Sequence, residues 1–182
     1  LKLNLKAKAY STEEIYFLLG QCKFKLGDKK GAINAYNKSI LINPDLPGPY
    51  NEIGKIYELN NDNINALKNY NLAIEKSPED PDAYNKRGEL KRENGNLKEA
   101  LKDYEKIIII SPKDSFNYFN IAEIKKDEKK FEEAINYYTL AIKYNSNYPW
   151  FYSSRARSKE EINDLKGSIS DYSKALKIEP NS

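Results

Sequence analysis

Histidine and methionine are absent from this chain of 182 residues, and cysteine occurs once, at Cys22. A single cysteine cannot form an internal disulfide, and the lack of histidine and of paired cysteines removes the common zinc sites and catalytic triads. No glycine-rich phosphate-binding loop is found either. The longest apolar run, Ile107 to Ile110, is too short to form a transmembrane helix. We therefore expect neither a metal nor a cofactor.

The charges of the two signs are balanced, with 30 basic and 27 acidic side chains and a formal net charge of +3. They are interspersed along the chain, so nucleic acid is not an expected partner. Adjacent carboxylates occur at Glu13-Glu14, Glu132-Glu133 and Glu160-Glu161. Neighbouring side chains diverge on a helix, so we interpret these pairs as solvated helix faces and expect no catalytic activity.

A repeat of 34 residues organises the chain, and two ladders of tyrosine mark it. The ladders are Tyr16, Tyr50, Tyr84, Tyr118 and Tyr152, and Tyr36, Tyr70, Tyr104, Tyr138 and Tyr172. We place five blocks at residues 13–46, 47–80, 81–114, 115–148 and 149–182, and we interpret residues 1–12 as a tail or the remnant of a preceding element. Such a chain is a stack of equivalent units rather than one core with a buried active site.

Each block holds two apolar segments with helical spacing, which predicts two helices per block. The breaks between the segments are Gly27-Asp28, Asn61-Asp62, Gly95-Asn96 and Asn163-Asp164. Glycine and asparagine tolerate the left-handed conformation that ends a helix, so these dipeptides are suitable turns. Lys129 at the same position of the fourth block departs from this pattern.

Other residues predict where the helices begin and end. Ser11 followed by Glu14 has the form of a capping box, so the first helix should begin near Thr12 or Glu13. Prolines follow the second helix of four blocks, at Pro44, Pro78, Pro112 and Pro180. In the fourth block Ser146 stands there instead, and we expect Pro149 to supply the stop.

Small residues share one position in the first helix of every block. They are Gly20, Gly54, Gly88, Ala122 and Ala156. Glycine inside a helix costs roughly 0.5–1 kcal/mol relative to alanine, so its repeated use predicts close helix packing with tyrosine rings filling the adjacent space. Cys22 lies at the position that holds isoleucine or leucine in the next three blocks, so we expect a buried thiol.

The stretch Ala83-Tyr84-Asn85-Lys86-Arg87-Gly88, followed by Gly95-Asn96, Ala100, Tyr104 and Pro112, resembles the signature of the tetratricopeptide repeat. The resemblance extends over residues 13–182. It implies an all-α fold, a right-handed α-solenoid superhelix of antiparallel helix pairs in which the first helices line a concave groove. In that family the groove usually holds an extended peptide or a helix of a partner protein. The resemblance thus implies a non-catalytic scaffold for protein–protein interaction.

If the first helices line a groove, five positions of each block face it, namely the second, fifth, sixth, ninth and twelfth. The candidate partner-binding residues are Asn51, Lys55, Asn85, Lys86, Glu89, Arg92, Phe119, Asn120, Glu123, Trp150 and Arg157. Gln21, Phe24, Glu52 and Asp82 occupy the same positions. An asparagine amide can both donate to and accept from a peptide backbone, although asparagine is abundant throughout this chain.

Some members of the family clamp a terminal carboxylate with lysines, an arginine and asparagines. Here Glu89, Trp150 and Ser154 stand where clamp groups would be, so we do not expect that clamp. Trp150 is either an anchor for a partner or a cap for the junction between the last two blocks. Phe17, Leu18 and Phe24 either receive an apolar ligand side chain or pack under Leu1, Leu3 and Leu5.

Two alternatives to the groove hypothesis remain open. Tyr172, Ala175 and Ile178 have no further helix after them to cover them, and solenoids usually need a polar cap. The ends of the repeat array could therefore stack with another copy to build a homo-oligomer. The repeats could also be a regulatory appendage of an enzyme whose catalytic domain lies outside these residues.

Overall fold

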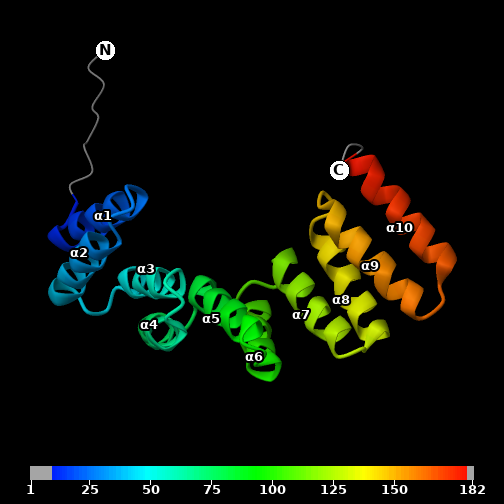
Figure 1. The fold of residues 1–182 in the computed structure, drawn as a ribbon, viewed down its shortest axis with the longest axis horizontal. Helices are drawn as coiled ribbons and strands as arrows, with labels where there is room; N and C mark the ends of the chain where they lie inside the picture. The colour runs from blue at the N-terminus through cyan, green and yellow to red at the C-terminus, as the bar shows by residue number, and fades with distance from the viewer. Residues whose placement is uncertain (1–9, 180–182) are drawn as a thin grey trace, which may run out of the picture. The chain divides into compact units, whose positions relative to one another are not determined.

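The computed structural model describes residues 10–179, and this range contains ten α-helices and no β-strand (Figure 1). The helices are α1 (Thr12–Lys25), α2 (Lys29–Ile42), α3 (Pro47–Glu58), α4 (Asn63–Lys76), α5 (Pro81–Glu93), α6 (Leu97–Ile110), α7 (Ser115–Asp127), α8 (Phe131–Tyr144), α9 (Pro149–Glu161) and α10 (Leu165–Ile178). The prediction of two helices per block is confirmed. The chain divides within α5 into two compact units, of which the first ends at Lys86 and the second begins at Arg87, and they are described separately below. No helix in the described range is long and apolar enough to span a membrane.

The turns inside the helix pairs follow the expected chemistry. Gly27 and Gly95 have φ of +83° and +78°, and Asn61 and Asn163 have φ of 59° and 62°. Lys129 takes the same conformation with φ of 60°, although lysine lacks the tolerance of glycine or asparagine. The backbone therefore repeats in the fourth block even where the sequence pattern fails.

The helix starts are set by caps and prolines. Ser11 and Glu14 form the predicted capping box, and α1 begins at Thr12. The expectation that Pro149 ends the second helix of the fourth block is wrong, because α8 already ends at Tyr144 and Pro149 is the first residue of α9. Proline suits that position since its missing N–H would have no partner inside the helix.

One tyrosine ladder forms the centre of the helix pairs. Tyr36, Tyr70, Tyr104 and Tyr138 are all fully buried. The predicted close packing against the small residues is confirmed in the first three pairs. A Cβ atom added at Gly20 would lie 2.3 Å from the Tyr36 ring, at Gly54 2.7 Å from the Tyr70 ring, and at Gly88 3.0 Å from the Tyr104 ring. Glycine at these positions makes room for the rings.

The expectation that Cys22 is buried is wrong, because its side chain is exposed. Ile56, at the same position of α3, is fully buried and packs with Ala32 and Tyr36 of the preceding helix pair. Within the described residues no helix precedes α1, so nothing there covers Cys22. Burial at this position depends on a neighbouring pair and not on the residue type.

Candidate functional site

Two adjoining hollows lie on the first helices of the unit that ends at Lys86. One, of about 190 Å³, is lined by Gln21, Phe24, Lys25, Glu52 and Lys55. The other, of about 270 Å³, is lined by Asn51, Glu52, Lys55, Asp82, Asn85 and Lys86. Glu52 and Lys55 belong to both, so the hollows form one groove that crosses α1, α3 and the start of α5, here called the first-helix groove.

The spacing of residues on α3 places this groove opposite the core. Ile53 and Ile56 are buried against the preceding helix pair. Asn51, Glu52 and Lys55 line the groove and alternate along the helix with these core residues. Apolar and polar residues thus occupy different stripes of one helix, and the polar stripe is the one left for contacts outside the core.

Charged groups of both signs face the groove. Lys55 Nζ lies 3.9 Å from Glu52 Oε2 and 5.5 Å from the centre of the Phe24 ring. The side chains of Lys55 and Glu52 remain 46% and 26% exposed, so their ion pair is weak and can be exchanged for contacts with another molecule.

Asn51 carries an acceptor without a partner. Its Oδ1 atom is buried and accepts no hydrogen bond within the described residues. A buried polar atom that lacks a hydrogen bond is uncommon and costs stability, so a turn of the Asn51 amide that brings Oδ1 to the N–H group of a ligand would remove that cost. Asn85 lines the same hollow from α5.

In the unit that begins at Arg87, two of the predicted residues are engaged inside the protein. The Phe119 ring lies 4.9 Å from that of Phe151 and 5.6 Å from that of Tyr138. Glu123 accepts hydrogen bonds from Lys126 and from the Tyr138 hydroxyl. Burial raises the pKa of Glu123, but these hydrogen bonds outweigh it and the pKa is lowered. Both residues therefore help to hold their helix pairs.

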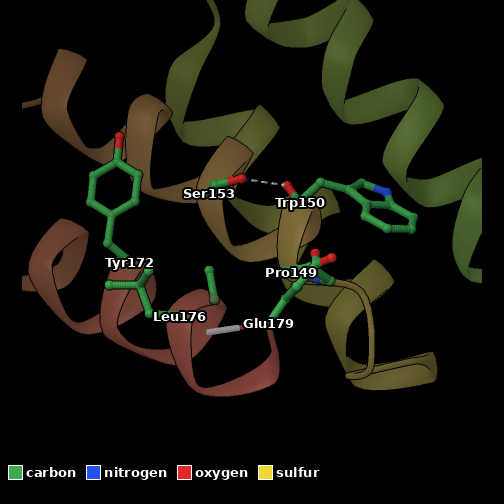
Figure 2. Close-up of a pocket in the computed structure, with 7 residues that line it drawn as sticks. Pro149, Trp150, Ser153, Tyr172, Leu176 and Glu179 are labelled. Atoms are coloured by element: carbon green, nitrogen blue, oxygen red, sulfur yellow. Dashed lines mark hydrogen bonds between the residues drawn. The ribbon is translucent and has the colours of Figure 1, made fainter. Parts of the chain in front are cut away.

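The other predicted residues of this unit differ in exposure. Asn120 and Glu89 are half-buried, Arg157 is exposed, and Arg92 has a buried Nε atom without a hydrogen-bond partner in the described range. Trp150 is 43% exposed, and its ring lies 4.5 Å from that of Tyr148. It also borders a separate hollow between α9 and α10, where its carbonyl oxygen accepts a hydrogen bond from Ser153 Oγ (Figure 2).

Phe17, Leu18 and Phe24 were expected either to receive an apolar ligand side chain or to pack under Leu1, Leu3 and Leu5. The rings of Phe17 and Phe24 are partly buried against the core cluster of Tyr36 and Ile53, Leu18 is 39% exposed, and Phe24 also lines the first-helix groove. Residues 1–9 lie outside the described range.

Sequence reasoning missed two buried ionic networks. Asp103 accepts hydrogen bonds from Arg87 and Lys91, and Asp171 accepts them from Arg155 and Lys159. The two sets are 68 residues apart, which is twice the repeat length. That recurrence of Arg, Lys and Asp at fixed positions was the available signal. The networks join the first and second helices of their blocks.

Across the described residues, helix pairs of one design recur, and the first helices α1, α3 and α5 carry the first-helix groove. This arrangement defines a tetratricopeptide-repeat protein, and residues 13–46 match the tetratricopeptide repeat family model. A second family model, described as the ETO1 C-terminal domain, matches residues 30–182. The chain therefore belongs to the family described as the ETO1 C-terminal domain, and it is built of tetratricopeptide repeats. No curated protein matches the sequence.

Solved structures share the fold at low sequence identity. The chain is similar to a crystal structure of MamA protein, with 20% identity, a TM-score of 0.80 and 92% of each chain covered. It is also similar to MamA from Desulfovibrio magneticus RS-1, with 15% identity, a TM-score of 0.81, and 96% of this chain and 99% of the other covered. A third is YrrB, described as a TPR protein with an unusual peptide-binding site, with 14% identity, a TM-score of 0.74, and 91% and 86% covered. The predicted all-α, TPR-like solenoid fold is confirmed.

Proposed function

We propose that this protein is a non-catalytic interaction scaffold that binds an extended segment of a partner protein in the first-helix groove. The observation that carries the proposal is the groove itself, whose lining residues all come from α1, α3 and α5. Eight of its nine lining residues stand at positions that the repeat pattern predicts to face a ligand. YrrB, a protein of the same fold, is described as having a peptide-binding site, which supports the same class of ligand.

The chemistry of the groove suits a peptide backbone flanked by charged side chains. Once its side chain turns into the groove, Asn51 offers its unpartnered Oδ1 as an acceptor for a peptide N–H, and its amide nitrogen is a donor for a peptide carbonyl. Lys55 and Lys86 can pair with acidic side chains of the ligand, and Glu52 with basic ones. Specificity then comes from the order of charges along the ligand, because the backbone contacts are the same for every sequence.

A peptide library bound to the purified protein tests this proposal. Peptides selected on the wild type are measured by fluorescence anisotropy against Asn51→Ala and against the double variant Lys55→Glu, Lys86→Glu. We expect at least about tenfold weaker binding for the double variant, since it replaces attraction by repulsion at two contacts. The matched control is Lys30→Glu, Lys68→Glu, which reverses two exposed lysines on the second helices α2 and α4.

Equal binding by the wild type, the groove variant and the control would reject the groove as the binding site. Selection of no peptide at all would reject peptide binding as the function. Circular dichroism of each variant separates a lost contact from a lost fold.

A second candidate role is association between copies. It is favoured by the exposed apolar side chains on α1 and α10, which include Ile15, Leu19 and Leu176. This role uses other surfaces than the first-helix groove, so the two are compatible.

A further inference from the structure

Helix α1 exposes an apolar stripe whose equivalents in α3 and α7 are buried. Ile15 is 53% exposed and Leu19 is 42% exposed, and Cys22 continues the stripe one turn later. The corresponding residues are Pro49, Ile53 and Ile56 in α3, and Asn117, Ile121 and Ile124 in α7, and all six are buried. In α3 this stripe packs against the helix pair before it. The exposed stripe on α1 therefore has the position and the residues that would pack against another helix pair.

The opposite surface is found at α10. A hollow of about 480 Å³ lies between α9 and α10, lined by Pro149, Trp150, Ser153, Tyr172, Ala175, Leu176 and Glu179 (Figure 2). Leu176 is 57% exposed, and Tyr172 is the one member of its tyrosine ladder that is not fully buried. An exposed apolar hollow of this kind is typical of an interaction surface.

One repeat earlier, the equivalent place between α7 and α8 is occupied by α9, the first helix of the following block. Phe151 of α9 is fully buried and packs with Ala141, Ile142 and Phe119. Residues 34 positions further on are Ala175, Leu176 and Ser153, and all three line the hollow. The residue 136 positions before Phe151, which is four repeat lengths, is Ile15. The hollow thus lies where the third residue of the following block packs one repeat earlier, and Ile15 is the third residue of its block.

We propose that two copies of this chain associate head to tail, with α1 of one copy packed on α9 and α10 of the other and Ile15 seated in the hollow beside Leu176. The junction repeats the internal contact between α8 and α9. This arrangement specifies which ends of the two copies meet and which residues face each other, and so makes the second candidate role above more specific. It does not depend on the first-helix groove.

The polarity follows from the repeat. Consecutive helices run antiparallel, so the end of α10 would meet the start of the incoming α1. That end carries Lys177 in the last turn and Glu179 at the C-cap, and the first turn of α1 carries Glu13 and Glu14. Lys177 can pair with these carboxylates and Glu179 opposes them, so the register is set by the apolar residues at equivalent repeat positions.

A heterologous junction allows a decisive mixing experiment. The head is the apolar surface of α1 and the tail is the hollow between α9 and α10. Ile15→Glu disrupts the head and leaves the tail intact, whereas Leu176→Glu disrupts the tail and leaves the head intact. Each variant alone is expected to be monomeric by light scattering at concentrations where the wild type gains mass, with self-association at least about tenfold weaker. An equimolar mixture contains one intact head and one intact tail, so it is expected to form a dimer and nothing larger.

The matched control is Ile64→Glu, which places the same charge at an isoleucine of α4 that is 83% exposed. It should associate as the wild type does, and so should the groove variant Lys55→Glu, Lys86→Glu. A wild type that stays monomeric across the concentration series would overturn the proposal. So would self-association of Ile15→Glu alone, which would indicate a tail-to-tail contact, or a mixture that stays monomeric while both variants are folded by circular dichroism.

Discussion

Arg155 holds the carboxylate of Asp171 with two hydrogen bonds, 2.8 Å from Nε to Oδ2 and 2.7 Å from Nη2 to Oδ1. Lys159 adds a third, 2.8 Å from Nζ to Oδ2. Asp171 is only 1% exposed, so its charge depends on these partners rather than on water. The network joins α10 to two successive turns of α9.

Removing the charge of Asp171 should therefore destabilise the protein. Asp171→Asn leaves Arg155 and Lys159 beside a neutral side chain, and loss of one partner from a buried ion pair typically costs about 3–5 kcal/mol. Urea unfolding followed by circular dichroism measures this loss. The control is Asp127→Asn, an exposed carboxylate at the end of α7 that should change stability by less than about 0.5 kcal/mol. A similar, small effect of both variants would mean that the network is not a source of stability.

The same network predicts sensitivity to acid. Burial raises the pKa of Asp171, but the hydrogen bonds from Arg155 and Lys159 outweigh it, so the pKa in the folded protein is below its ordinary value of 3.8. A lowered folded pKa adds stability above the unfolded pKa, and this contribution is lost as the pH falls from about 4 through the folded pKa. The free energy of unfolding should drop over this range in the wild type and drop less in Asp171→Asn. Parallel pH profiles for the two proteins would contradict the assignment.

The sequence was sufficient for the helix pairs, because these depend on local spacing. The groove positions came from the resemblance to the tetratricopeptide repeat, and in α3 the structure places Asn51 and Lys55 at the hollow and Ile53 and Ile56 in the core. Cys22 shows the limit of that reasoning, since its burial depends on a helix pair that is not among the described residues.

Polar pairs between helices were harder to find. Asp171 lies 16 residues after Arg155, a separation with no meaning inside one helix, and a charged residue is read by default as solvated. Glu123 was assigned to the groove by its position in the block, and that position does not reveal its hydrogen bonds from Tyr138 and Lys126. The partners of such groups become visible only when the helices are placed side by side.

The glycines of the first helices should differ in their tolerance of alanine. A Cβ atom at Gly20 would lie 2.3 Å from the buried Tyr36 ring, and at Gly88 3.0 Å from the Tyr104 ring. Gly20→Ala should therefore destabilise by about 1–3 kcal/mol through overpacking. Gly88→Ala should be close to neutral, because a small ring shift is offset by roughly 0.5–1 kcal/mol of improved helix propensity. Ala122 shows that a methyl group fits beside Tyr138. Thermal unfolding of both variants ranks them, and the reverse order would refute the packing argument.

The buried hydroxyls of Tyr70 and Tyr36 should contribute unequally to the free energy of unfolding. Tyr70 Oη donates to Glu58 Oε2 at 2.5 Å, whereas the hydroxyl of Tyr36 is buried and has no partner among residues 10–179. Tyr70→Phe should cost about 1.5–3 kcal/mol, because a hydrogen bond to a charged group is lost. Tyr36→Phe should be neutral or stabilising, because it removes a buried polar atom that lacks a hydrogen bond. Urea unfolding at pH 7 compares the two, and equal losses would show that ring packing alone decides their contribution.

Alkaline titration gives an independent check on Tyr36. Burial raises the pKa of its phenol above 10.0, and the nearby Glu52 and Cys22 add to the shift. A raised folded pKa contributes stability that is full below pH 10 and is lost as the pH rises further, because the unfolded chain ionises first. The wild type should thus lose stability above pH 10 more steeply than Tyr36→Phe. Identical slopes for the two proteins would indicate that the Tyr36 hydroxyl reaches solvent.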